Sequence, residues 1–247
     1  MKKEIKNFRI GHEMGKKSGG KISQYCDLIV GSRSIWKLIR FELIMLLFSN
    51  IPGALGLFLR SKFYPLILKK CGKSPVFGSH IVFRHSEKIE LGDNVLIDDN
   101  CMLDAKGTDN LGIVLKNNVF LGRNSILSSK NGTIILEDGV NIGFNCNIFS
   151  GSSVCLGKNT LVAAYCYFIG GDHGVSDLNQ TFYDQTSFSS GITVGENCWF
   201  GAGAKIQDGI TVGANSLIGT SSVVTKDIPE YSVSVGIPAK VIKDRRG

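Results

Sequence analysis

One histidine of this 247-residue chain stands where acid–base chemistry is feasible. The chain has four histidines, at positions His12, His80, His85 and His173. His173 follows Gly-Gly-Asp at the start of a long irregular segment, and an imidazole there can accept a proton near neutral pH. Two roles are open for Asp172, which either orients the ring or only shapes a turn. The competing explanation for His173 is a loop histidine satisfied by backbone contacts.

The residues around His173 belong to a repeat with a period of six. From Cys71 onward, Leu, Ile, Val or Phe recurs every six residues, is often followed by Gly, and has a small or β-branched residue four positions later. Three such hexads make 18 residues, which is one coil of three short strands. Coils begin at Cys71, Leu91, Leu115, Leu136, Leu156, Val194 and Val212. The short fixed period predicts an all-β solenoid, a parallel β-helix of about seven coils.

Extra residues enter these coils at one place only. Wherever a coil exceeds 18 residues, the excess follows the third hexad, so every insertion should leave the solenoid at the same corner. Stacked coils then line the insertions along one edge. The longest one, a loop at about 174–193, begins directly after His173. Insertions gathered on one side of a repeat array usually form its binding face.

The interior of the predicted solenoid needs two kinds of side chain. The first residue of each hexad should point inward, and the residue four later should point inward near a tight corner, while Gly after the leader should allow the sharp corner without a Cβ clash. The small inward positions are Val95, Cys101, Val119, Ser125, Val140, Cys146, Thr160, Cys166, Cys198, Ala204, Ser216 and Ser222. Four of the seven cysteines lie there, and no Cys/His metal spacing occurs. We therefore expect packing thiols, a reducing compartment and no metal.

The N-terminal part differs from the repeat in charge and pattern. Residues 1–73 carry 15 Lys and Arg against four Asp and Glu, whereas residues 74–247 carry 13 against 17. We expect a disordered basic tail over 1–24, without the apolar run of a secretory signal, and hence a cytoplasmic protein. Residues 25–70 should form an apolar, basic helical arm. One helix should end near Asn50–Gly53, and a second should run from about Ala54 to Lys69.

Two interpretations of this arm remain open. The helices could cap the open N-terminal end of the solenoid, which such a rod requires. They could instead lie peripherally in the inner-leaflet interface, with their basic residues on anionic lipid. A transmembrane span is disfavoured because Pro52, Gly53 and Gly56 interrupt the apolar run. Nucleic acid is not an expected partner, since no recognition motif accompanies the basic residues.

Several motifs together resemble one enzyme family. Besides the hexads, the quoted segments are Gly170-Gly171-Asp172-His173-Gly174, Val194-Gly195-Glu196-Asn197-Cys198-Trp199-Phe200-Gly201-Ala202, Ser222-Val223-Val224-Thr225-Lys226-Asp227-Ile228-Pro229 and Val235-Gly236-Ile237-Pro238-Ala239-Lys240-Val241-Ile242. They resemble the hexapeptide-repeat acyltransferases, most closely the sugar O-acetyltransferases of surface-polysaccharide biosynthesis. The resemblance covers about 71–247. It implies a left-handed β-helix over 71–229, a segment 230–247 near a coenzyme A site, and a homotrimer.

The resemblance also implies roles for individual residues. His173 would deprotonate a sugar hydroxyl that attacks acetyl-CoA directly, with no covalent enzyme intermediate, and Asp172 would assist it. The cofactor-binding set would be Trp199, Gly201, Ala202, Gly219, Thr220, Thr225, Lys226, Lys240 and Lys243. Cations suit the phosphates of coenzyme A, although lysine offers a point charge and no bidentate fork. In the family, His from one subunit meets cofactor contacts from its neighbour.

One departure leaves the acceptor open. Simple sugar acetyltransferases place Asn and Asp near the acceptor, whereas hexad alignment puts Gly143 and Gly151 there, with Asn145 and Asn147 nearby. A surface glycan or its lipid-linked precursor would explain a membrane-seeking arm. Three alternatives remain: an N-acetyltransferase acting on an amino sugar, a non-catalytic scaffold, and a metal-dependent hydratase using three histidines. The last is disfavoured, because two of its histidines would lie on coil one and the third on coil five.

Overall fold

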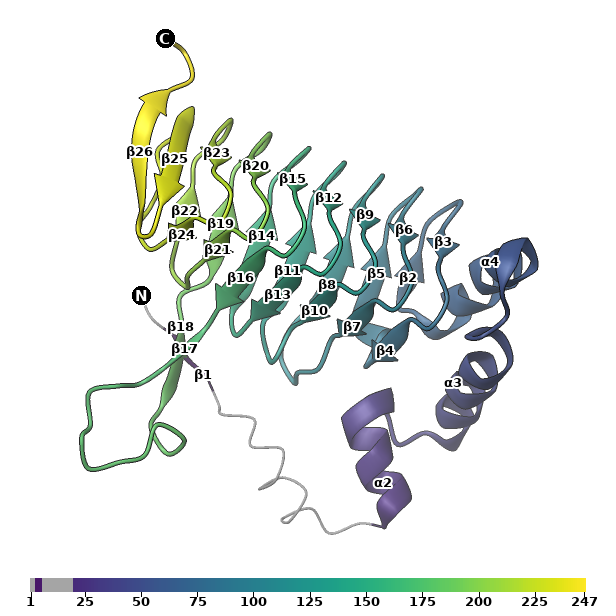
Figure 1. Cartoon of the computed structure of the whole chain (residues 1–247). Helices are drawn as coiled ribbons and strands as arrows, with labels where there is room; N and C mark the ends of the chain where they lie inside the picture. The colour runs from purple at the N-terminus through teal and green to yellow at the C-terminus, as the bar shows by residue number, and fades with distance from the viewer. Residues whose placement is uncertain (1–2, 6–19) are drawn as a thin grey trace.

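Three parallel β-sheets run along the molecule and enclose a three-sided solenoid, in a computed structural model that describes residues 3–5 and 20–247 (Figure 1). We number the sheets as sides in chain order. Side 1 holds β2 (Lys70–Cys71), β5 (Ile89–Leu91), β8 (Gly112–Leu115), β11 (Thr133–Leu136), β14 (Ser153–Leu156), β19 (Ile192–Val194) and β22 (Thr211–Val212). Side 2 holds β3 (Val76–Phe77), β6 (Leu96–Ile97), β9 (Phe120–Leu121), β12 (Asn141–Ile142), β15 (Leu161–Val162), β20 (Trp199–Phe200), β23 (Leu217–Ile218) and β25 (Ser232–Gly236).

Side 3 completes each coil. It holds β4 (Val82–Arg84), β7 (Met102–Asp104), β10 (Ile126–Ser128), β13 (Asn147–Ser150), β16 (Tyr167–Gly170), β21 (Lys205–Ile206) and β24 (Val223–Val224). We name the edges corner 1–2, corner 2–3 and corner 3–1 after the sides that they join. Loops of different length connect side 3 to side 1, so the insertions do share corner 3–1, as predicted (Figure 1).

The solenoid has about eight turns, one more than the predicted seven. Side 2 continues with β25, and Ile228 bridges to Val212 on side 1, but no third side closes this last turn. The antiparallel strand β26 (Ala239–Asp244) pairs with β25 at the C-terminal end. The hexad count missed this turn because Ile228 follows the leader Val224 by four residues, and Ser234 occupies the next inward position.

The predicted interior is confirmed at every small position. All twelve small or β-branched residues expected to point inward are buried, including the four cysteines. Leaders such as Leu121, Ile142 and Phe200 are also fully buried and form one continuous core. All seven cysteines are free thiols. The repeat therefore determines the packing of the interior, in which a large and a small side chain alternate around each coil.

Asparagine, rather than glycine, makes most of the sharp corners. The residue three positions after a leader takes a left-handed backbone, as at Asn124 with φ of 60° and Asn145 with φ of 56°. Asn tolerates this conformation better than most residues. The glycine after the leader serves another purpose. A Cβ on Gly122 would lie 2.7 Å from the carbonyl carbon of Gly143, so glycine is needed where one coil approaches the next.

Helices cover the N-terminal end of the solenoid (Figure 1). They are α2 (Lys21–Tyr25), the π-helix η1 (Cys26–Val30), α3 (Ile35–Phe48), α4 (Gly53–Phe63) and the 3₁₀ helix η2 (Tyr64–Ile67), and a further 3₁₀ turn η3 (Ser86–Lys88) joins β4 to β5. The second predicted helix ends at Phe63 and not near Lys69, because Pro65 cannot continue an α-helix. No described helix is long and apolar enough to cross a bilayer.

The expected tail is described only in part. Residues 21–24 belong to α2, and residues 3–5 form the strand β1. The other residues of the tail lie outside the described part of the chain.

Aromatic packing joins the cap to the first coil. Tyr64 is fully buried, and its ring lies edge-on to Phe77 and Phe83 with centroids 5.3 and 5.4 Å away. Phe41 and Ile44 of α3 belong to the same core. The cap therefore covers inward residues of the first coil that would otherwise meet water, as a terminal repeat must.

A buried arginine fastens the cap. Arg60 is 2% exposed, and its guanidinium donates hydrogen bonds to the carbonyls of Phe77 (2.9 Å), Phe48 (3.2 Å) and Ile51 (2.7 Å). These carbonyls come from the first coil, the end of α3 and the turn before α4. One side chain thus joins three segments that have no continuous hydrogen-bonded ladder between them.

We predict that Arg60→Met lowers the free energy of unfolding by about 3 kcal/mol or more, because it leaves three carbonyls without their charged donor. Urea denaturation of the full chain measures this. Lys62→Met is the matched control, since Lys62 is exposed on the same helix. Equal destabilisation by the two variants would contradict the role assigned to Arg60.

Candidate active site

His173 lies on a flap that leaves the solenoid at corner 3–1 (Figure 1). The flap begins with β17 (Asp172–His173), which pairs antiparallel with β18 (Ser187–Ser189) in a register that sets His173 opposite Ser187. The strand β1 (Lys3–Ile5) pairs with the other edge of β18. A histidine from the fifth coil is therefore held on a small three-stranded sheet outside the prism.

Ser187 positions the imidazole. Its hydroxyl lies 3.2 Å from His173 Nδ1, and Ser187 is buried although His173 itself is exposed. When Nδ1–H donates to this hydroxyl, Nε2 is unprotonated and can accept a proton. Among the described residues, no group forms a hydrogen bond with Nε2. The ring is thus oriented at one nitrogen and open at the other.

Asp172 does not contact the imidazole through a hydrogen bond. Its Oδ1 instead accepts the backbone N–H of His173 at 2.8 Å. Of the two roles that the sequence left open for Asp172, this geometry favours the turn-shaping one. The orienting residue is Ser187, which sequence reasoning missed because it lies fourteen positions away in an irregular segment.

Asp208 fastens the base of the flap to the next coil. Its carboxylate accepts the backbone N–H groups of Ser190 (2.7 Å) and Gly191 (2.9 Å) and the hydroxyl of Ser189 (3.1 Å). The Ser189 hydroxyl oxygen also lies 3.1 Å from the carbonyl oxygen of Gly170, where β16 ends, so its one proton can be shared between the two acceptors. Both strands of the flap are therefore tied to the solenoid at their roots. Sequence reasoning missed Asp208, which lies in a corner with no motif of its own.

A buried amide organises the loop beyond the strands. Gln185 is buried, accepts the N–H of Asp177 at 3.3 Å and donates to its carbonyl at 3.0 Å. These two bonds close residues 177–185 into a compact turn.

The residues predicted to bind the cofactor divide between two corners. Gly201, Ala202, Gly219 and Thr220 lie along corner 2–3 on the sixth and seventh coils, with Trp199 beside them on side 2. Thr225 and Lys226 follow β24 at corner 3–1, the corner that also bears His173. Side 3 separates the two groups by roughly 15–20 Å, at about 3.3 Å per residue. One chain does not bring them together.

The predicted lysines lie on the last strand of side 2. Lys240 pairs with Val235 and Lys243 pairs with Val233 across β25 and β26, and both lysines are exposed. They continue the side on which Trp199 lies. The C-terminal segment thus places cations at the end of side 2.

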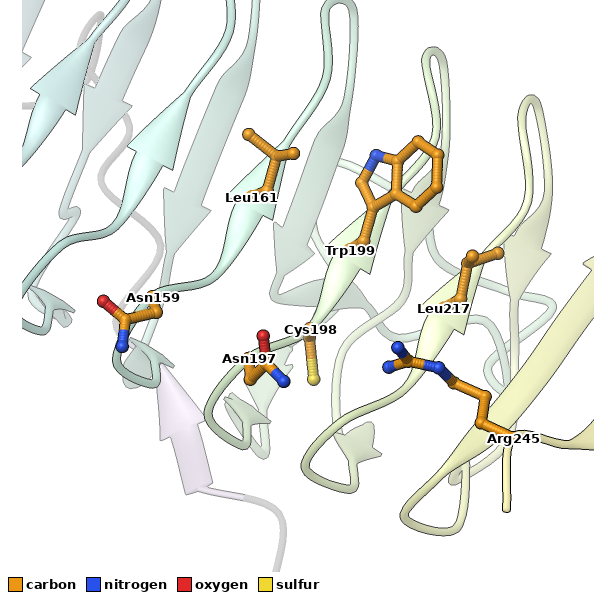
Figure 2. A pocket seen from close by; sticks show the side chains of 7 residues that line it. All are labelled: Asn159, Leu161, Asn197, Cys198, Trp199, Leu217 and Arg245. Atoms are coloured by element: carbon orange, nitrogen blue, oxygen red, sulfur yellow. The ribbon is translucent and has the colours of Figure 1, made fainter. Parts of the chain in front are cut away.

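A pocket of about 280 Å³ lies on side 2 between Trp199 and the C-terminal segment (Figure 2). Trp199 is 49% exposed and stands in a row with Leu161 and Leu217 along successive coils. Arg245 reaches into this pocket and donates to the carbonyl of Asn215. The full lining is Asn159, Leu161, Asn197, Cys198, Trp199, Leu217 and Arg245. An apolar row with one guanidinium suits a ligand that is partly apolar and partly anionic.

Arg245 is a third residue that sequence reasoning missed. The Arg245-Arg246 pair was visible in the sequence but outside any motif, and only the antiparallel return of β26 brings it to Trp199.

The cysteine in this pocket is not a nucleophile. Burial raises the pKa of the Cys198 thiol, which donates to the carbonyl of Gly213 at 3.2 Å. Burial likewise raises the pKa of Cys101 to about 12. Protonated, inward-facing thiols cannot attack a thioester at neutral pH.

No metal-binding constellation is found in residues 3–5 and 20–247, where no group of three or more His, Cys, Asp or Glu side chains is arranged to hold an ion. His80 and His85 lie in the first coil and His173 in the fifth, so the three histidines required for a hydratase do not cluster within the chain.

Comparison with known proteins agrees with this architecture. Residues 191–226 match the family model described as bacterial transferase hexapeptide (six repeats). The chain is 30% identical over 128 residues to "Probable acetyltransferase Rv3034c" of Mycobacterium tuberculosis, covering 52% of this chain and 43% of that one. It is 30% identical over 119 residues to "Putative lipopolysaccharide biosynthesis O-acetyl transferase WbbJ" of Escherichia coli, covering 45% of this chain and 61% of that one.

A solved structure shows the same fold. The N-acyltransferase AntD from Bacillus cereus, in complex with dTDP and 3-hydroxybutyryl-CoA, superposes with a TM-score of 0.54 at 15% identity, covering 75% of this chain and 88% of that one. The chain spans 43% and 61% of the length of the two curated relatives. The repeat, the family match over residues 191–226 and the similarity to these acetyltransferases agree with the hexapeptide-repeat resemblance that the motifs predicted.

We predict that Asp208→Ala loosens the flap without unfolding the solenoid. Losing three hydrogen bonds to a carboxylate should speed amide exchange in β17 and β18 about tenfold to a hundredfold. Hydrogen–deuterium exchange with mass spectrometry measures it. Asp227→Ala is the matched control, because Asp227 accepts the N–H of Thr211 at 2.7 Å at the same corner without a flap. Unchanged exchange in Asp208→Ala would remove this carboxylate as the anchor.

Proposed function

We propose that this protein is an acetyl-CoA-dependent O-acetyltransferase acting on a sugar hydroxyl of a surface glycan or its lipid-linked precursor. The observation that carries the proposal is the His173–Ser187 pair, which orients an exposed imidazole at Nδ1 and leaves Nε2 open. The similarity to a protein named as a lipopolysaccharide biosynthesis O-acetyl transferase supports the sugar hydroxyl as acceptor.

The chemistry would run through His173. Its Nε2 takes the proton of the acceptor hydroxyl while the hydroxyl oxygen attacks the thioester carbonyl carbon of acetyl-CoA. The carbon–sulfur bond then breaks, and the imidazolium returns the proton to the departing thiolate, so the products are an acetyl ester and free coenzyme A. No enzyme-bound acyl group is needed, which agrees with Cys198 and Cys101, whose pKa values burial raises.

The chain offers suitable contacts for coenzyme A. Arg245, Lys240 and Lys243 supply cations at the C-terminal end of side 2 for the phosphates, and the exposed Trp199 supplies an apolar wall for the pantetheine arm. The backbone along Ala202 and Thr220 continues this path at corner 2–3. Donor and base groups then lie on opposite edges of side 3.

That separation favours a homotrimer with its threefold axis parallel to the solenoid. In such a ring, corner 3–1 of one copy faces corner 2–3 of the next, so that the flap of one subunit meets the cofactor contacts of its neighbour. The site would then lie between subunits, and three identical sites would form.

We further propose that the cap binds the cytoplasmic face of a membrane peripherally. The inner face of α3 packs on the first coil through Phe41 and Ile44, yet its outer face is also apolar. The exposed apolar side chains of the cap are Ile35, Trp36, Ile39, Leu43, Leu46, Leu47, Leu55, Leu57, Phe58 and Leu66. An exposed apolar patch of this extent on a surface helix is typical of an interaction site.

Charge selects an anionic lipid surface for that role. Lys62, Lys69 and Lys70 are exposed on or just after the helices, and residues 1–73 carry a net charge of +11. Clustered cations beside exposed apolar side chains are typical of proteins that lie on anionic bilayers. A membrane position would bring the flap near lipid-linked acceptors.

We predict that His173→Ala lowers kcat at least a hundredfold while the melting temperature is kept. Release of coenzyme A thiol from acetyl-CoA, with surface-glycan fragments as acceptors, measures turnover, and alkaline lability of the product distinguishes an ester from an amide. His80→Ala is the control histidine, far from the flap on the first coil. Near-normal turnover in His173→Ala would refute the proposed base, and an alkali-stable product would indicate N-transfer.

We predict that the protein sediments with phosphatidylcholine vesicles containing phosphatidylglycerol, less so at high salt, and that Leu46→Glu with Leu47→Glu reduces binding tenfold or more. Leu46 is 76% exposed on the cap. Leu178→Glu is the matched control, since Leu178 is 94% exposed on the flap. Equal sedimentation of the double variant and the wild type would rule out the cap as the contact.

A further inference from the structure

An aromatic and cationic ladder occupies corner 2–3 on the third, fourth and fifth coils. Arg123, Phe144 and Tyr165 follow β9, β12 and β15 in turn. The ring centroids of Phe144 and Tyr165 are 5.8 Å apart with planes at 80°, and Arg123 Cζ lies 4.9 Å from the Phe144 centroid. We call these three residues the ledge.

The ledge faces solvent. Tyr165 is 62% exposed and Phe144 is 39% exposed, so their rings do not serve the core of this chain. Arg123 forms no salt bridge with any described acidic residue. Its guanidinium lies over one face of Phe144, and its remaining donors are available. The Asp98 carboxylate accepts the backbone N–H of Arg123 at 3.3 Å, but no described carboxylate forms a salt bridge with its guanidinium. The ledge thus combines open aromatic surface with a guanidinium that is available to a ligand.

Tyr165 is held in an unfavourable backbone conformation. Its φ is 62°, in the left-handed region that an aromatic side chain rarely adopts. The matching positions on the neighbouring coils are Asn124, Asn145, Gly203 and Ser221, residues better suited to it. Strain of this kind is concentrated at functional sites. We expect Asn at position 165 to make the coil more stable. Stability of the fold therefore does not explain why a tyrosine lies there.

The height of the ledge links it to the proposed reaction. Ala202 and Thr220 lie on the same corner one and two coils above Tyr165, and His173 leaves side 3 in the same coil as Tyr165. Rotation about an axis parallel to the solenoid keeps heights unchanged. In the proposed trimer the neighbour's His173 therefore reaches the level at which the donor contacts end and the ledge begins.

Resting on the proposed function, we propose that the ledge is the acceptor subsite and that it selects a glycan carrying an acidic sugar. The pyranose ring lies on the face of Tyr165, whose negative quadrupole attracts ring C–H groups. The guanidinium of Arg123 binds the carboxylate of that sugar or of its neighbour. The coils are about 4.8 Å apart, so the ledge is long enough for one or two sugar rings.

Tyr165→Asn is the sharpest test, because it removes the ring while relieving the backbone. We expect a higher melting temperature, together with at least tenfold weaker binding of a glucuronic-acid-containing disaccharide measured calorimetrically on the full chain. Arg123→Gln should weaken that probe about tenfold and leave its neutral glucose counterpart unchanged. Glucose 1-phosphate, as a third probe, distinguishes an acidic sugar from any sugar phosphate.

Tyr231→Asn is the matched control. Tyr231 also has a left-handed backbone, with φ of 57°, and carries Arg246 at 4.7 Å from its ring, but it lies at corner 1–2. Its replacement should not change disaccharide binding.

Two outcomes would overturn the ledge as a subsite. The first is that the wild type does not bind the acidic disaccharide, or that Tyr165→Asn binds it as tightly as the wild type does. The second is a change of oligomeric state in Tyr165→Asn by analytical ultracentrifugation, which would make the ledge a subunit contact. A failure of the proposed function can be distinguished from these outcomes. In that case the wild type transfers no acetyl group from acetyl-CoA, whether or not it binds the disaccharide. Stronger binding of glucose 1-phosphate than of the disaccharide would replace the carboxylate by a phosphate and contradict the acidic-sugar assignment.

Discussion

Close stacking of successive coils is the constraint on which the structure depends. Each coil hydrogen-bonds to the next along all three sides, and a Cβ on Gly122 would lie 2.7 Å from the backbone of the next coil. The connections at corners 1–2 and 2–3 have the same length in every coil. Corner 3–1 alone takes insertions, so a functional loop on this chain has one edge available to it. The flap with His173 lies there for a packing reason as much as for a chemical one.

The same constraint explains which features the sequence predicts. Hexad leaders, small inward residues and the flap follow from spacing within a few residues, and the structure agrees with each. The eighth turn was missed because the step from Val224 to Ile228 breaks the period. Contacts such as Ser187 with His173, Asp208 with Ser189 and Arg245 with the Trp199 pocket join distant segments. Their partners are chosen by coil stacking and by the return of β26, which no local pattern encodes.

The cap has an apolar inner face, which covers the first coil, and an apolar outer surface, which is exposed. Its inner face must be apolar to cover the first coil, and Arg60 must hold it there through backbone carbonyls because irregular segments meet at that point. Its outer face carries a second apolar surface that this chain leaves open to water. Sequence patterning showed a strongly apolar helix but not which apolar residues would be used inward, since large apolar residues occur on both faces of α3.

His173 is exposed to water, and the described part of the chain provides no surface that covers it. A base surrounded by water on a projecting flap gains little from its orientation, because water competes for the acceptor and screens the developing charge. Catalysis at His173 therefore needs a second surface that excludes water. Among the described residues, most of the contacts that we propose for donor and acceptor lie across side 3, on side 2 and corner 2–3. A neighbouring copy can present that corner at the height of the flap, so the proposed chemistry and the proposed assembly depend on each other.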